Sequence, residues 1–256
     1  MVNQSLMRLG KLAPAQDDRT LQLVKYLTPG IKLPTPPKLQ VWSKPVKSWH
    51  MYQNDQIGDC TCATAAHLIH CWSANSKRQE HELTDQEVVG MYSLITGYNP
   101  KKPETDRGAI ELSVLKYWTN RGFAGHKLGA FVAVSPTSAQ IIKDAIYLFG
   151  GIYTGFALPL SAREKAIWDV PPGGLRGQGE VGSWGGHAVP IIDYDERVLT
   201  CVTWGKLQRM TWGFLQAYMD EAYALISPDF LAGDKAPNGF DLATLQKDLV
   251  ALRTAA

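Results

Sequence analysis

Long hydrophobic runs are missing from this sequence. None approaches the roughly 20 apolar residues that a transmembrane helix requires. The opening stretch MVNQSLMRLGKLAPAQDD also lacks the continuous apolar segment of a secretory signal peptide. An excess of one charge is missing too, since 26 Lys and Arg residues stand against 24 Asp and Glu residues, whereas nucleic-acid binding depends on neutralising phosphates. We expect a cytoplasmic protein that binds neither membranes nor nucleic acid.

Cysteine is scarce as well. The four cysteines, Cys60, Cys62, Cys71 and Cys201, are irregularly spaced, which argues against a disulfide framework and indicates reduced thiols. Zinc knuckles place their cysteines on a turn, whereas Cys60 and Cys62 lie in a segment of helical pattern, where the two thiols diverge. We therefore expect neither a metal ion nor another cofactor.

The order of the sequence patterns predicts an α+β fold with two segregated lobes, because helical patterns precede short β-rich runs. The chain is long enough to bury about 70 to 75% of its unfolded apolar surface. Residues 33–45 (LPTPPKLQVWSKP) are rich in proline and are expected to run extended over the surface. The expected divisions are an extended arm (1–45), a helical lobe (46–125), a β lobe (126–230) and a linker with an amphipathic helix (231–256).

Local signals mark the ends of several elements. Thr84 and Glu87 form a capping-box pattern, and Gly97 lies beyond the end of the same helix. Ser135 and Pro136 have the pattern of a cap followed by proline at the first helical position. The expected helices are 60–72, 84–96, 109–118 and 136–149, and the expected strands are 151–158, 187–194, 197–204 and 221–227. A further amphipathic helix is expected at the C-terminus, with one apolar stripe formed by Leu242, Leu245, Leu249 and Leu252.

The stretch QNDQIGDCTCATAAHLIHCW (53–72) places a thiol at the start of a predicted helix. Asp59 is a residue type favoured at the N-cap, which makes Cys60 the first helical residue, where the helix dipole and free backbone N–H groups favour a thiolate. Cys62 shares its face with Ala65 and is expected to be buried as a small hydrophobic residue. Cys60 is therefore the predicted reactive thiol, although cysteine at a helix start is more often structural.

A histidine strand lies far downstream. Residues 185–205 (GGHAVPIIDYDERVLTCVTWG) have the pattern of a β-hairpin that turns near Asp195 and Glu196. This turn places His187 across from Trp204, within about one residue.

The glycine-rich loop 171–186 leads into that strand, and loops of this length usually serve a site or stay mobile. Gly185 and Gly186 leave the approach to His187 open because they carry no side chains. Together with Trp184 they are expected to form the rim of a cleft.

A cysteine at a helix start followed by a distant histidine on a strand is the order found in papain-like cysteine peptidases. The chain resembles that superfamily over about residues 50–227, and the pattern Asn-Asp-x-x-Gly-Asp-Cys looks like that of little-characterised bacterial and phage-borne members. Residues 58–60 (GDC) are similar to the family's Gly-Ser-Cys, and residues 83–89 (LTDQEVV) are similar to its Leu-Ser-Glu-Gln-Glu-Leu-Val helix. Residues 106–109 resemble its glycine-rich turn, and residues 121–123 resemble the Tyr-Gly-Ile ending of the helix that follows. Residues 187–189 resemble its His-Ala-Val strand, and residues 204–205 resemble the end of its Asn-Ser-Trp-Gly motif.

The resemblance implies a papain-like α+β fold, in which a helical lobe is followed by an antiparallel β lobe with the active-site cleft between them. It implies that Cys60 is the nucleophile, that His187 is the general base and later the general acid, and that Asn54 joins the Cys60 backbone N–H in the oxyanion hole. A second register stays open, in which Cys62 is the nucleophile and Gln56 takes the oxyanion position.

The sequence departs from the family at the residue that orients the histidine. The family's asparagine aligns with Val202, whose side chain forms no hydrogen bonds. Thr203 is a candidate for orienting the imidazole, but strand alternation is expected to point it to the opposite face. Trp204 is expected to shield the imidazole.

These residues predict a papain-like thiol hydrolase that cleaves a peptide or other amide bond through a cysteine acyl-enzyme, with a peptide or protein as its substrate. Two alternatives stay open. One is an amide-bond transferase or deamidase with the same Cys-His dyad. The other is a catalytically silent binding module or a structural module of a phage particle. The C-terminal helix is a candidate contact between copies of the chain.

Overall fold

The structure is a computed structural model that describes residues 7–23, 34–76, 79–135, 138–232 and 235–241. None of the helices in these segments is long and apolar enough to cross a membrane. The predicted C-terminal leucine stripe begins at residue 242 and lies outside the described residues.

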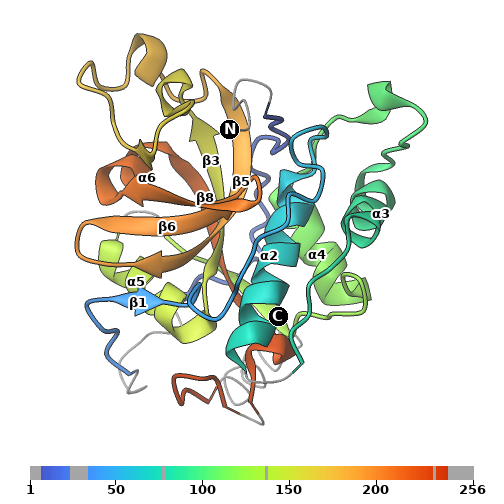
Figure 1. The fold of residues 1–256 in the computed structure, drawn as a ribbon, viewed down its shortest axis with the longest axis vertical. Coiled ribbons are helices and arrows are strands. Elements are labelled where there is room, and N and C mark those ends of the chain that lie inside the picture. Colours follow the sequence, from blue (N-terminus) through green and yellow to red (C-terminus); the bar gives the residue numbers. More distant parts are fainter. Residues whose placement is uncertain (1–6, 24–33, 77–78, 136–137, 233–234, 242–256) are drawn as a thin grey trace.

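A central helix, α2 (Cys60–Asn75), lies between a β sheet and two further helices, α3 (Asp85–Thr96) and α4 (Glu111–Arg121) (Figure 1). Nearly all of α2 is buried, and its alanines and other small residues let the sheet and the helices approach it from both sides. The indole of Trp72 donates a hydrogen bond to the carbonyl oxygen of Phe149 at 2.9 Å. Helix α2 therefore joins the helical part to the β part.

The described strands form one eight-stranded sheet in the order β2-β8-β3-β5-β6-β7-β4, with β1 paired to β5. All neighbouring pairs are antiparallel except β4 and β7, and helix α2 packs against β5. The remaining elements are β1 (Gln40–Val41), β2 (Ala130–Ala133), α5 (Ala139–Phe149), β3 (Ile152–Leu158), β4 (Ile167–Trp168), β5 (Gly185–Tyr194), β6 (Val198–Thr203), β7 (Lys206–Thr211), α6 (Trp212–Tyr218) and β8 (Met219–Ile226).

The predicted elements are present, with some shifted ends. All four predicted strands are confirmed as β3, β5, β6 and β8, each within two residues of the expected bounds. The capping box of Thr84 and Glu87 is confirmed, and Gly97 ends α3 in the left-handed conformation with φ 77°. Helix α5 starts later than predicted, because the Ser138 hydroxyl accepts the capping hydrogen bond from Ile141 N–H. Strands β2 and β7 and helix α6 were not predicted.

The proline-rich stretch 33–45 was expected on the surface, and this is wrong at Trp42 and Ser43, which are buried. Trp42 is buried, and its indole N–H donates to the carbonyl oxygen of Ile146 at 2.9 Å. The preceding strand β1 pairs with the end of β5. Burial of the large indole ring of Trp42 stabilises the fold, and it holds this segment in contact with the rest of the protein.

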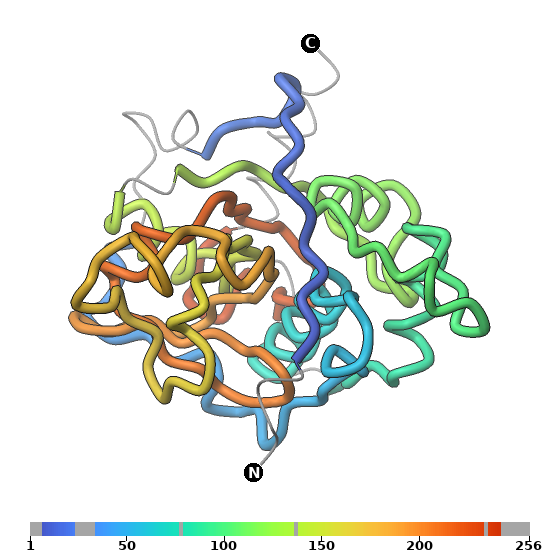
Figure 2. The backbone as a smooth tube through the Cα atoms, turned by 90° about the horizontal axis from the view of Figure 1, so that it is seen from above, coloured from blue at the N-terminus to red at the C-terminus, as the bar shows by residue number. Residues whose placement is uncertain are grey.

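The N-terminal arm crosses the junction between the helical part and the sheet. Residues 7–23, dark blue in Figure 2, run between the helical part and the sheet. Met7, Lys11 and Leu23 are buried along this path. Residues 12–22 are exposed or half-buried, so the arm lies over the junction, anchored by a few buried residues, and contacts both lobes.

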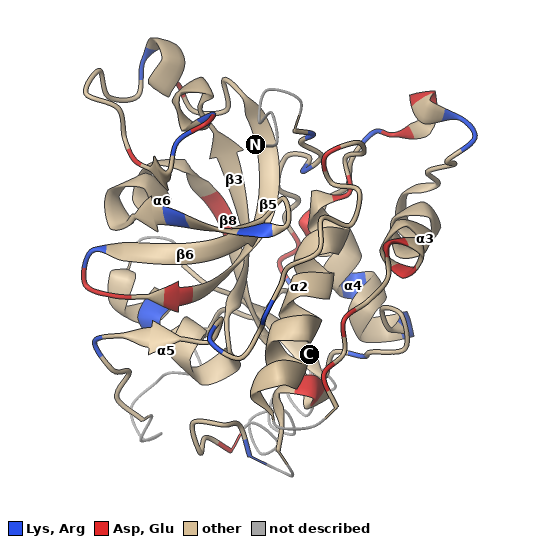
Figure 3. Ribbon diagram, in the orientation of Figure 1, with Lys and Arg blue, Asp and Glu red and all other residues tan. Residues whose placement is uncertain are grey.

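Charged residues of both signs are interspersed along the helices and outer loops (Figure 3). Surface pairs such as Lys38 and Glu196, 3.2 Å apart, are typical of such a surface and contribute little to stability. Lys11 differs from these surface residues, because its side chain is only 1% exposed and lies among acidic groups.

Candidate active site

The N-terminus of α2 and the N-terminal half of β5 meet at one point, where the Cys60 sulfur lies against the backbone of the strand that carries His187. The backbone N–H of Ala188, the residue after the histidine, donates to the Cys60 sulfur at 3.4 Å. Cys60 and His187 are each 1% exposed. The two residues singled out from distant parts of the sequence therefore lie at the same junction between the lobes.

The imidazole of His187 is held on two sides. Its Nε2 lies 2.7 Å from the Thr203 hydroxyl, and the Trp204 ring stacks on it with centroids 4.4 Å apart and planes 16° apart. The other ring nitrogen, Nδ1, is buried and has no hydrogen-bond partner among the described residues. A tautomer with its proton on Nε2 would donate to Thr203 and leave Nδ1 free to accept a proton.

Strand alternation was expected to turn Thr203 away from His187, and this is wrong. The ladder between β5 and β6 shifts register between Ile191 and Asp193, and beyond that bulge Ile191 pairs with Cys201. A shift of one residue exchanges the two faces of a strand. With this register Thr203, and not Val202, shares the face of His187.

The predicted oxyanion residue is engaged elsewhere. Asn54 is buried, and its amide Nδ2 donates to the carbonyl oxygen of Ile57 at 3.3 Å. Asp59 stands at the N-cap of α2, but its side chain makes no capping hydrogen bond, contrary to its expected role. Burial raises the pKa of the Asp59 carboxyl well above its usual value, and the Asn54 side chain opposes this shift. A buried carboxyl of this kind does not act as a charged cap.

The residues of the second register lie apart from the histidine junction. Cys62 is fully buried within the hydrophobic core, whereas Gln56 is exposed. Burial raises the pKa of the Cys62 thiol well above its usual value. The described segments hold no group of three or more His, Cys, Asp or Glu residues placed to bind a metal ion.

Burial sets the protonation states of the central pair. It raises the pKa of the Cys60 thiol to about 12, although the backbone N–H groups of Ala188 and Gly10 act to lower it. Burial also lowers the pKa of His187 to about 3. At neutral pH this structure therefore holds Cys60 as a protonated thiol and His187 as a neutral imidazole.

The arm covers the thiol. Gly10 packs so tightly between two other glycines that a Cβ atom on it would overlap the Gly58 carbonyl, and a Cβ on Gly108 would overlap the Gly10 carbonyl oxygen. The N–H of Gly10 is directed at the Cys60 sulfur. Glycine is required here because three backbone segments approach one another closely.

Backbone hydrogen bonds hold the arm to both lobes. On the β side, Lys11 N–H donates to the Gly186 carbonyl oxygen at 3.1 Å. On the helical side, Ala109 N–H donates to Gly10 at 2.8 Å and Leu12 N–H donates to Ala109 at 2.9 Å. The arm thus bridges the lobes as an extended strand.

The predicted rim residues lie beside this strand. A Cβ on Gly185 would press on Leu9, so the absence of a side chain here makes room for the arm. Trp184 lies beside Trp204, with ring centroids 5.5 Å apart, and the Trp204 indole N–H donates to the Arg8 carbonyl oxygen at 3.4 Å.

Sequence reasoning missed the arm and its neighbours. Gly10 stands in an unremarkable stretch, RLGKL, and nothing local marks it as a partner of Cys60. The available signal was the presence of Gly10, Gly58 and Gly108 at three separate places, since glycine permits close backbone approach. Which glycines meet one another was not readable from the sequence.

In a chain whose arm is loosened by Gly10→Ala, we expect Thr203→Val to lower kcat/KM roughly 10- to 100-fold, because general acid–base catalysis needs a correctly oriented imidazole. The change should fall on kcat, with KM little altered, and should displace the pH profile of kcat. Thr203→Ser keeps the hydroxyl and should retain most of the activity. Equal losses in the two variants would show that packing, and not the hydroxyl, matters at this position.

No protein-family model and no curated protein matches the sequence, but solved structures match the fold. Xylellain, a cysteine protease from Xylella fastidiosa, matches with TM-score 0.65 and 14% identity over 86% of this chain and 96% of that chain. Digestive procathepsin L 3 of Tenebrio molitor larval midgut matches with TM-score 0.58 and 11% identity, covering 87% and 77%. The ragweed pollen cysteine protease Amb a 11, in its proform, matches with TM-score 0.56 and 12% identity, covering 75% and 66%. The α+β fold is therefore that of papain-like cysteine proteases.

Proposed function

We propose that the chain is a thiol hydrolase that cleaves peptide bonds, with Cys60 as nucleophile and His187 as general base. The observation that carries this proposal is the contact of the Cys60 sulfur with the residue next to His187, at the start of a buried helix. The unpartnered Nδ1 of His187 and the hydroxyl of Thr203 at Nε2 support the assignment.

In the proposed reaction, Nδ1 of His187 takes the proton from the Cys60 thiol, and the sulfur attacks the amide carbonyl carbon. The C–N bond breaks, the amine leaves with the proton from the imidazolium, and water then hydrolyses the thioester. The N–H of Cys60 stabilises the oxyanion, joined by Asn54 once its hydrogen bond to Ile57 opens.

The arm holds this centre in a latent state. Because Gly10 lies against the sulfur, no carbonyl can reach Cys60 while the arm is in place. The same burial keeps the thiol protonated. Displacement of residues 8–12 would admit both water and substrate to the site. It would also return the pKa of the Cys60 thiol and that of the His187 imidazole toward their usual values.

The raised pKa of Cys60 and the valine at position 202 favour a second candidate, a catalytically silent binding module. A transferase or a deamidase would use the same Cys-His pair. The substrate, a peptide or a protein, is part of the proposal, as is the site of action, a bacterial cytoplasm or a phage particle.

Product analysis separates these candidates. The full-length chain carrying Gly10→Ala, whose added Cβ overlaps the Gly58 carbonyl and so loosens the arm, is incubated with an unfolded protein, with and without a primary amine. The products are examined by mass spectrometry. New N-termini are the expected result. Released ammonia with intact chains would indicate a deamidase, and incorporated amine a transferase. Intact products together with slow labelling of all thiols by a thiol-directed epoxide would establish the silent module.

A further inference from the structure

Lys11 places its ammonium group in a pocket of carboxylates beside the thiol. Its Nζ lies 2.8 Å from the Asp220 carboxylate and 3.2 Å from that of Glu221, and it donates to the Leu12 carbonyl oxygen at 3.2 Å. Burial acts to lower the pKa of Lys11, but the acidic groups, Glu111 first, outweigh it and raise the pKa above its usual value. The lysine is therefore charged in this pocket.

The pocket holds more acidic side chains than one lysine can pair with. Glu111, at the start of α4, is fully buried, and neither of its carboxyl oxygens accepts a hydrogen bond from a described residue. Burial and the neighbouring Glu221 raise the pKa of Glu111, and Lys11 opposes them. Burying two acidic groups, Glu111 and Glu221, beside a single buried lysine costs stability, so packing alone does not account for them.

The walls of the pocket are shaped for a long cationic side chain. Gly155 on β3 forms one wall, and a Cβ there would overlap the aliphatic part of Lys11. The Tyr223 hydroxyl donates to Glu221 Oε2 at 3.0 Å, which leaves Oε1 for the ammonium. These residues belong to the body of the protein and stay in place if the arm leaves.

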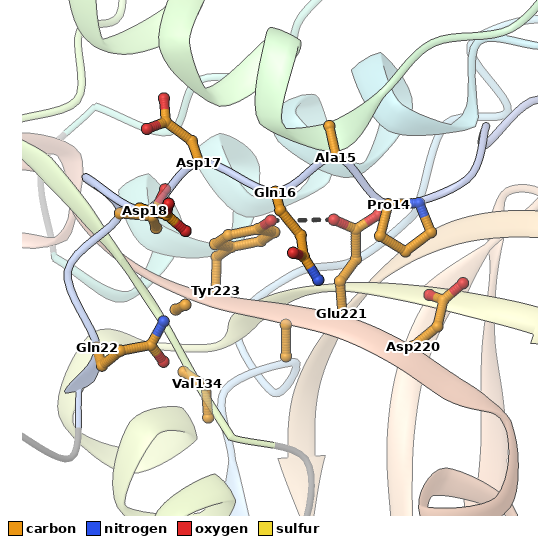
Figure 4. Close-up of a pocket in the computed structure, with 13 residues that line it drawn as sticks. Pro14, Ala15, Gln16, Asp17, Asp18, Gln22, Val134, Asp220, Glu221 and Tyr223 are labelled. Atoms are coloured by element: carbon orange, nitrogen blue, oxygen red, sulfur yellow. Dashed lines mark hydrogen bonds between the residues drawn. The ribbon is translucent and has the colours of Figure 1, made fainter.

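Two of the acidic groups are also reachable from outside. Asp220 and Glu221 line one end of a cavity of about 470 Å³ between the arm and strand β8 (Figure 4). The Asp220 side chain is 28% exposed. A side chain larger than that of lysine therefore finds room beside these carboxylates.

We propose that Glu111, Asp220 and Glu221 form a substrate subsite of the Cys60 centre that selects a lysine or arginine side chain, and that Lys11 fills this subsite in the latent chain. The backbone of the arm bonds to Gly186 and Ala109 as an extended peptide would, and Gly10, the residue before Lys11, contacts the thiol. A substrate using these backbone groups carries a side chain into the same pocket. This inference rests on the proposed function.

A binding experiment tests the subsite without catalysis. Two heptapeptides, MRLGKLA from residues 7–13 and the same peptide with norleucine for lysine, are titrated into full-length Gly10→Ala, whose own arm is weakened. Norleucine keeps the aliphatic chain and removes the charge. We expect the lysine peptide to bind about 10-fold tighter or better, because a buried charge pair is sensitive to loss of one partner. Equal binding, or binding of neither peptide, would overturn the subsite.

Cleavage of a peptide library by the same Gly10→Ala protein measures which side chains the subsite selects. We expect lysine and arginine to be enriched at one position near the cut bond. Asp220→Asn and Glu111→Gln should each lower the ratio of lysine to norleucine cleavage about 10-fold. Both cleavage rates in this ratio are measured on the same variant. If a substitution changes how often the arm leaves the site, it changes both rates equally and leaves the ratio unaltered. Cleavage without enrichment would overturn the subsite and leave the hydrolase standing. No cleavage with no labelling of Cys60 would instead remove the hydrolase, and binding of the lysine peptide would then identify a cation-binding pocket alone.

Discussion

Gly10→Ala will raise the rate at which iodoacetamide labels Cys60 by about 100-fold or more at neutral pH. A Cβ at position 10 overlaps the Gly58 carbonyl, and neither backbone can yield without breaking the contacts of the arm. Once the arm moves, water reaches the sulfur and the pKa of the thiol falls from about 12 toward its usual value. Each unit of this fall raises the thiolate fraction about tenfold, partly offset by lower nucleophilicity.

The pH dependence of the labelling rate shows in which direction the pKa of Cys60 changes. In the wild-type chain the thiolate fraction grows with pH across the whole neutral and mildly alkaline range, because the pKa of Cys60 is about 12. In Gly10→Ala the rate should level off at a lower pH. Mass spectrometry of the digested protein locates the adduct.

The matched control for this experiment is Gly90→Ala on α3. A Cβ at Gly90 meets no atom within 4 Å, so this variant should label like the wild type. An unchanged labelling rate in Gly10→Ala, with an unchanged melting temperature, would show that the arm does not protect the thiol.

Cys60→Ala will lower hydrolysis by about 10⁴-fold or more, as removal of a catalytic nucleophile does. Cys62→Ala keeps the nucleophile and should retain activity. It should lower the free energy of unfolding by about 0.5 to 1.5 kcal/mol, because it removes a small group from the core. Initial rates on a peptide substrate and urea unfolding of both variants measure the two effects.

The reverse pattern would contradict the assignment. If Cys62→Ala abolished hydrolysis and Cys60→Ala did not, Cys62 would be the nucleophile and Gln56 the oxyanion residue. Both variants should be prepared with and without Gly10→Ala, because a latent chain hides the difference between them.

Local signals predicted the elements better than their contacts. The capping box at Thr84 and the left-handed Gly97 depend on neighbours in the chain, and the structure confirms both. The start of α5 was misplaced because two serines competed for the cap and Ser138 has the free Ile141 N–H within reach. The face of Thr203 was misjudged because a bulge in β5 and β6 leaves no trace in the alternation of either strand.

The sequence by itself determined the α+β order of elements, the helix that begins at Cys60 and the strand that carries His187, since these depend on periodicity, turns and residue types close in the chain. Only the tertiary structure decided that the Cys60 sulfur contacts the backbone next to His187, that Thr203 lies at the imidazole, and that Gly10 approaches the thiol. It also decided that Lys11 is buried with Glu111, Asp220 and Glu221. The physical reason is that ion pairs and close glycine contacts form between residues far apart in sequence, and no local preference records which partner each one finds.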